Sequence, residues 1–87
     1  MDKQYLRKAS NLFWLISKKA KIAPDFFDGI STEFSYLSRR NVELDEEFTR
    51  LWDWLKSEVK NGYIPTFTLG QIEAVLFLKK KEKEVKV

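Results

Sequence analysis

Apolar residues recur at steps of three and four along most of this sequence, which constrains the fold more than any other feature. The stretch 45–61 is the clearest case. Five apolar residues share one face of a 3.6-residue helix there: Phe48, Leu51, Trp52, Leu55 and Val59. Acidic residues begin the stretch, Lys60 lies in its last turn, and Gly62 can take the left-handed conformation that ends a helix. We expect this stretch to be the central helix of an all-α fold, in contact with every other helix.

Three further stretches, at about 2–21, 24–40 and 69–81, show the same periodicity. The expected inward face of the first is Tyr5, Leu6, Ala9, Leu12, Phe13, Ile16 and Ala20. That of the second is Phe26, Phe27, Ile30, Phe34 and Leu37, and that of the last is Leu69, Ile72, Val75 and Leu76. The sequence therefore predicts a compact four-helix bundle.

Helix-start residues support these bounds. Pro24 suits a first helical position, and Thr68 with Gln71 has the form of a capping box for the last helix. Gly29 falls on the polar side of its helix, where it weakens the helix by about 1 kcal/mol relative to alanine. We expect one domain over 1–81 and a basic, frayed tail over 82–87. No internal repeat is evident.

The 87-residue composition argues against catalysis. The chain has no cysteine and no histidine, so thiolate zinc sites, disulfides and a Ser-His catalytic pair are excluded. Its three glycines are dispersed, which leaves no phosphate-binding loop. The acidic run Glu43, Asp45, Glu46 and Glu47 could offer oxygen ligands to a cation, but acids at a helix start are ordinary helix-stabilising residues. We expect no enzyme activity, no cofactor and no metal.

Charge is distributed unevenly along the chain. Residues 1–21 carry a net charge of +5, residues 22–78 carry −5, and residues 79–87 carry +3. Abundant Lys and Glu without cysteine is a composition typical of thermophilic organisms. Neither a signal peptide nor a run of about 20 apolar residues is present, so we expect a cytoplasmic protein without a membrane partner.

Trp14 is the first misplaced aromatic residue, because it lies on the basic face of its helix with Arg7, Lys18 and Lys21. Cations around an exposed aromatic ring are what phosphate neutralisation and base stacking require. One hypothesis is therefore direct nucleic-acid binding through these four residues. Two alternatives remain open: cover by the last helix or by residues 63–67, and contact with a protein partner.

Trp54, Phe77 and Leu78 lie away from the apolar stripes of their own helices, which makes them candidate protein-contact residues. The favoured hypothesis is a non-catalytic accessory or adaptor subunit that binds a protein complex of the kind that processes nucleic acid. The partner is either a different protein or further copies of this chain in a homo-oligomer.

Overall fold

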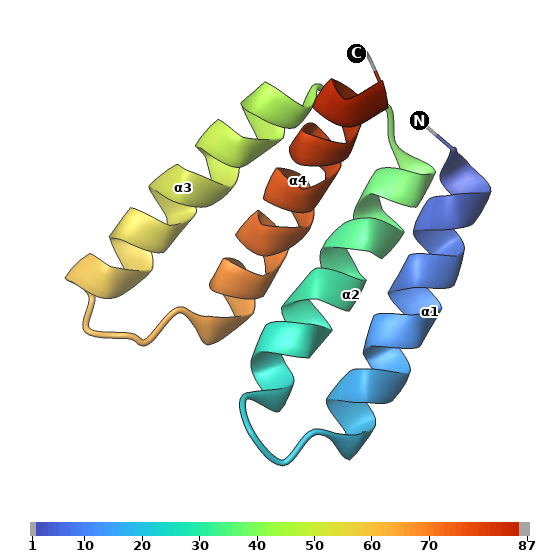
Figure 1. Ribbon diagram of the computed structural model, residues 1–87. Coiled ribbons are helices and arrows are strands. Elements are labelled where there is room, and N and C mark those ends of the chain that lie inside the picture. The colour runs from blue at the N-terminus through green and yellow to red at the C-terminus, as the bar shows by residue number, and fades with distance from the viewer. Residues whose placement is uncertain (1, 86–87) are drawn as a thin grey trace.

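The computed structural model describes residues 2–85, which form four α-helices and no strand (Figure 1). The helices are α1 (Lys3–Lys19), α2 (Pro24–Arg39), α3 (Leu44–Lys60) and α4 (Thr66–Val85). The predicted all-α, four-helix fold is confirmed. The first three helices agree with the predicted bounds to within two residues, whereas α4 begins three residues earlier than predicted and ends four residues later.

The helices lie side by side in the spatial order α1, α2, α4, α3 (Figure 1). Within the described residues, α2 packs between α1 and α4, and the backbone of α3 approaches that of α4 alone. The prediction that residues 45–61 form the central helix is therefore wrong. Only one side of α3 is covered, so Trp52 and Val59 of its predicted apolar stripe are 45% and 55% exposed.

The four helices are two copies of one helical hairpin, α1–α2 and α3–α4. Leu44 begins α3 41 residues after Lys3 begins α1, and Lys60 ends α3 41 residues after Lys19 ends α1. A Pro-x-Phe-x-x-Gly sequence starts at Pro24 and recurs 41 residues later. The repeat is not evident from the sequence alone, because few other identical residues accompany it.

Glycine allows the two hairpins to approach closely where α2 meets α4. A Cβ atom at Gly29 would lie 2.0 Å from the Phe67 carbonyl oxygen, and one at Gly70 would lie 2.0 Å from the Phe26 carbonyl oxygen. This reciprocity is what an approximate two-fold axis between the hairpins produces. Gly29 is thus buried against α4, and its predicted place on the polar side of its helix is wrong.

The core gathers residues from all four helices: Leu6, Ile30, Phe34, Leu37, Leu44, Leu51, Ile72, Ala74, Val75 and Leu78. The predicted inward faces of α1 and α4 need correction. Leu12, Leu69 and Leu76 are exposed, whereas Leu78 is buried. The reason lies in the order of the helices: α4 has neighbours on two sides, so its buried residues do not form a single stripe.

The helix ends follow local chemistry. The Asp2 carboxylate accepts hydrogen bonds from the first turn of α1, and Gly62 adopts the predicted left-handed conformation with a φ of 87°. The predicted capping box is wrong, since α4 has already begun at Thr66 and the Thr68 hydroxyl donates to Glu58 of α3. Residues 82–85 of the predicted frayed tail are helical, and residues 86–87 lie outside the described range.

Candidate functional site: an apolar groove between α1 and α4

An open groove runs over α2 between α1 and α4. Its volume is about 540 Å³. The α1 wall contributes Tyr5, Lys8, Ala9, Leu12 and Phe13, the floor is Ile30 and Phe34 of α2, and the α4 wall contributes Glu73, Ala74 and Phe77. Eight of these ten residues have apolar or aromatic side chains, so the groove offers a hydrophobic surface to solvent.

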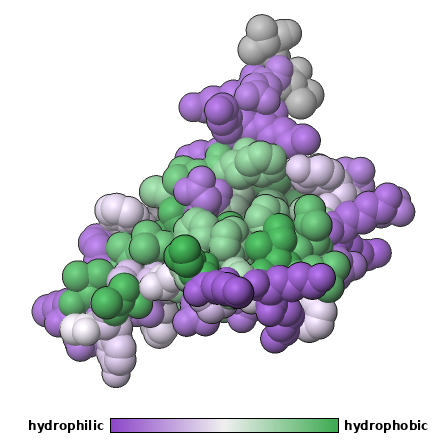
Figure 2. Space-filling model, turned by 60° about the horizontal axis from the view of Figure 1, so that its bottom comes forward, coloured by the Kyte–Doolittle hydropathy of each residue, from purple (hydrophilic) through white to green (hydrophobic). Residues whose placement is uncertain are grey.

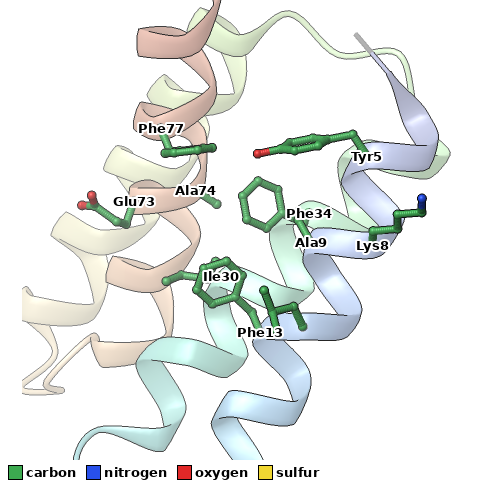
Figure 3. Close-up of a pocket in the computed structure, with 10 residues that line it drawn as sticks. Tyr5, Lys8, Ala9, Phe13, Ile30, Phe34, Glu73, Ala74 and Phe77 are labelled. Atoms are coloured by element: carbon green, nitrogen blue, oxygen red, sulfur yellow. The ribbon is translucent and has the colours of Figure 1, made fainter.

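Aromatic packing fixes the shape of the groove. The Phe34 ring lies 5.8 Å from the Phe13 ring and meets the Phe77 ring edge-to-face at 6.4 Å between centroids. Figure 3 shows Tyr5 and Phe77 reaching toward each other from opposite walls above Phe34. The Lys81 amine lies 4.4 Å from the centroid of the Tyr5 ring, a cation–π contact that links α4 to the start of α1.

The charged residues that line the groove are Lys8 on α1 and Glu73 on α4. Lys8 on α1 and Glu73 on α4 are both exposed, and Figure 3 shows them at the same level, directed outward on the two sides. Within residues 2–85, neither side chain forms an ion pair. Each is therefore available to a partner that lies over the groove.

Large apolar side chains remain partly exposed around this site. Leu12 is 56% exposed and Phe77 is 47% exposed. Figure 2 shows apolar residues gathered on one face of the molecule, with hydrophilic residues along the border. The groove lacks the several convergent polar groups by which small-molecule sites orient a ligand. Its lining suits apolar groups.

The sequence indicates only part of this site. Phe77 lies outside the apolar stripe of its helix and lines the groove, as do Tyr5, Leu12 and Phe13, whose spacing predicts core residues instead. A second apolar stripe on α1 could have indicated this wall of the groove, because Leu12 and Leu15 continue the helical spacing of Tyr5. In the structure, Leu12 and Leu15 are both more than half exposed.

The other two candidate contact residues do not line the groove. Trp54 is 60% exposed on α3, on a different helix from those that form the groove. Leu78 is 3% exposed and belongs to the core, so its prediction as a contact residue is wrong. Leu78 packs inward because it falls on the part of α4 that the neighbouring helices cover.

The basic face of α1 is exposed as a whole. Arg7, Trp14 and Lys18 project from the helix, and Lys21 lies in the connection that follows it. Trp14 is 48% exposed, with the Lys18 amine 5.2 Å from the ring centroid. A second hollow of about 450 Å³ adjoins it between α1 and α2. Its lining includes Asn11, Trp14, Thr32, Ser35 and Arg39, together with Asp28. This hollow is polar, unlike the groove.

A pair of buried carboxylates lies between α2 and α3. Glu33 and Glu47 are 0% and 1% exposed. Arg50 binds Glu47 through two hydrogen bonds of 2.8 Å, and Gln71 donates to Glu33 at 3.2 Å. The second carboxylate oxygen of Glu33 has no hydrogen-bond partner within residues 2–85. The first contact lies within α3 and the second joins α4 to α2, while Glu33 and Glu47 lie close enough to act on each other's charge.

Burial, then the neighbouring Glu47 carboxylate, raises the pKa of Glu33 to about 9. Burial alone would also raise the pKa of Glu47, but the hydrogen bonds from Arg50 and its positive charge outweigh burial and keep that pKa below its usual value. Near neutral pH, Glu33 is therefore protonated and Glu47 is charged, which matches the single charge of Arg50. Both carboxylates are buried, although the side chain of Arg50, which binds Glu47, is 56% exposed.

Comparisons with family models, with curated proteins and with solved structures each gave no match. Within the described residues, no group of three or more carboxylates is placed to hold a metal ion. No helix in the same range is long and apolar enough to span a membrane.

Proposed function

We propose that this protein is a non-catalytic accessory subunit that binds another protein chain through the groove between α1 and α4. The observation that supports this function is the open apolar groove, with Phe77 half exposed on its wall. Soluble proteins rarely leave contiguous apolar surface open unless a partner covers it. Aromatic side chains are also frequent among the residues that dominate binding energy at protein interfaces.

A pull-down from the native extract tests this proposal. The immobilised chain should retain a stoichiometric protein partner, and Phe77→Asp should lose it while the far-UV helical signal is unchanged. Leu76→Asp is the matched control. Leu76 immediately precedes Phe77 on α4 and is similarly exposed, but it does not line the groove. Equal retention by both variants would show that the groove is not the interface.

Direct nucleic-acid binding is a second candidate function, favoured by the half-exposed Trp14 beside Arg7 and Lys18. Stacking on an aromatic ring contributes about 1–3 kcal/mol per base, and neutralising phosphates makes binding salt-dependent. Single-stranded and duplex oligonucleotides should quench the fluorescence of the wild type more than that of Trp14→Phe. No affinity at about 50 mM salt would eliminate this candidate.

A further inference from the structure

We propose that the partner in the groove is a second copy of this chain, so that two copies form a closed dimer with the two grooves face to face. This inference rests on the proposed function, since it names the occupant of the same site. Its basis is the opposite charge of the two ionisable residues that line the groove, one on each wall. The wall from α1 is positive at Lys8, and the wall from α4 is negative at Glu73.

A two-fold axis along the groove pairs these walls. Rotation about such an axis turns the second copy over, so that its α1 lies opposite α4 of the first copy and its α4 lies opposite α1. Because Lys8 and Glu73 lie at the same level on the two walls (Figure 3), Lys8 of each copy then faces Glu73 of the other. Two identical ion pairs form from residues that have no ion-pair partner within residues 2–85 of the single chain.

The same rotation brings apolar surface together. Tyr5 of one copy lies opposite Phe77 of the other, since both side chains are at one level of the groove (Figure 3). Leu12 and Phe77, which line the groove and are about half exposed, belong to the surface that the second copy would cover. The dimer would thus have an apolar centre and a charged border, the usual arrangement of a specific interface.

The internal repeat shows why association should stop at two copies. The second hairpin creates an equivalent position on the opposite face of the molecule, but the residues 41 positions from Lys8 and Glu73 are Thr49 and Thr32. Neither carries a charge. The Lys8–Glu73 pair is therefore not repeated at the equivalent position, and an interface that uses the same patch on both copies is closed.

Sedimentation of the purified full-length chain tests the dimer. The wild type should sediment as a dimer. Lys8→Glu and Glu73→Lys should each weaken the dimer by about tenfold or more, because each places like charges opposite one another twice. The double variant Lys8→Glu/Glu73→Lys should dimerise as the wild type does, since both pairs are restored with reversed sign. Both side chains are exposed, so the helical signal should be unchanged in all three variants.

A wild type that stays monomeric up to about 1 mM would overturn the inference. So would single variants that dimerise as well as the wild type, or a double variant as weak as either single variant. A monomeric chain that still captures a Phe77-dependent partner from the extract leaves the proposed function in place with a different occupant. A monomeric chain that captures nothing removes both.

Discussion

Glu33 is the residue whose environment departs most from that of an ordinary surface side chain. It is fully buried, and it faces Glu47 and Gln71 from two other helices. The cluster has two carboxylates but one cation, Arg50, so Glu33 stays neutral by keeping its proton. Arg50, which also lies over the Tyr36 ring at 5.6 Å, balances the charge of Glu47 alone. The stability of the fold should therefore depend on the protonation of Glu33.

This dependence has a definite sign. Between the usual glutamate pKa of 4.5 and about 9, folded Glu33 keeps a proton that the unfolded chain releases. The free energy of unfolding should therefore fall as pH rises across this window, with a slope of at most about 1.4 kcal/mol per pH unit. Urea unfolding followed by circular dichroism at pH 5, 7 and 9 measures it.

Substitution separates the Glu33 contribution from other titrating groups. Glu33→Gln keeps a neutral side chain beside Gln71 and should flatten the decline in stability between pH 5 and 9. Glu46→Gln, which removes an exposed carboxylate from α3, should leave the decline as it is in the wild type. A decline of equal slope in the wild type and in Glu33→Gln would contradict the role assigned to Glu33.

At the scale of helices, the contact between α2 and α4 depends on two glycines. Gly29→Ala and Gly70→Ala would each place a Cβ atom 2.0 Å from a backbone carbonyl oxygen, which is far closer than van der Waals contact allows. The two helices must therefore move apart. We expect each variant to lose about 1–3 kcal/mol or more of unfolding free energy, measured by thermal or urea unfolding.

Gly62→Ala is the control for these variants. Nothing lies within 4 Å of its Cβ position, and only its positive φ opposes the substitution, so the loss should be about 1 kcal/mol. A loss at Gly29 or Gly70 no larger than the loss at Gly62 would show that the close helix contact is not required.

The edge position of α3 gives a further prediction about an element. Its backbone approaches α4 alone, and three of its large apolar side chains are exposed: Trp52, Trp54 and Val59. Helices with few buried contacts open at lower free energy than the global transition. Backbone amides of α3 should therefore exchange with deuterium faster than those in the middle of α2. Equal protection of both helices would contradict this arrangement.

The positions of the four helices could largely be predicted from the sequence. Apolar periodicity, Pro24 and Gly62 locate the helices, since these signals act within one or two turns. The packing order could not be predicted in the same way. Gly29 has no side chain to mark its face as buried, and a buried Glu47 contradicts every hydropathy pattern. Leu78 differs from Leu69 in burial only because of which helices lie beside α4.

The candidate site was harder to predict than the helices, because it is a property of three helices together. Each of Tyr5, Phe13 and Phe34 has the pattern of a core residue on its own helix. They line an open groove because α4 covers α2 beside α1 without closing over it. Only Phe77 departs from its own helix stripe, and it was the one residue of the groove that the sequence identified.

At the scale of the whole molecule, the proposed dimer should be visible as a change of size. A single chain has a Cα radius of gyration of 13.1 Å and extents of 40 × 29 × 23 Å. Small-angle X-ray scattering of Lys8→Glu should give a radius near that of one chain, with a small increase for the hydration layer. The wild type should give a clearly larger radius. Equal radii for the two proteins at the same concentration would contradict the dimer.

The two inner helices, α2 and α4, run in the same direction (Figure 1). Their backbone dipoles therefore add, and the electronegative ends of both helices emerge at the same pole of the molecule. The Lys3 amine lies 2.7 Å from the carbonyl oxygens of both Leu37 and Arg40, and further lysines close the last turns of α4. These cations act as built-in counter-ions. Lys3 and Lys83 thus offset part of the negative potential that the two helix ends create at this pole.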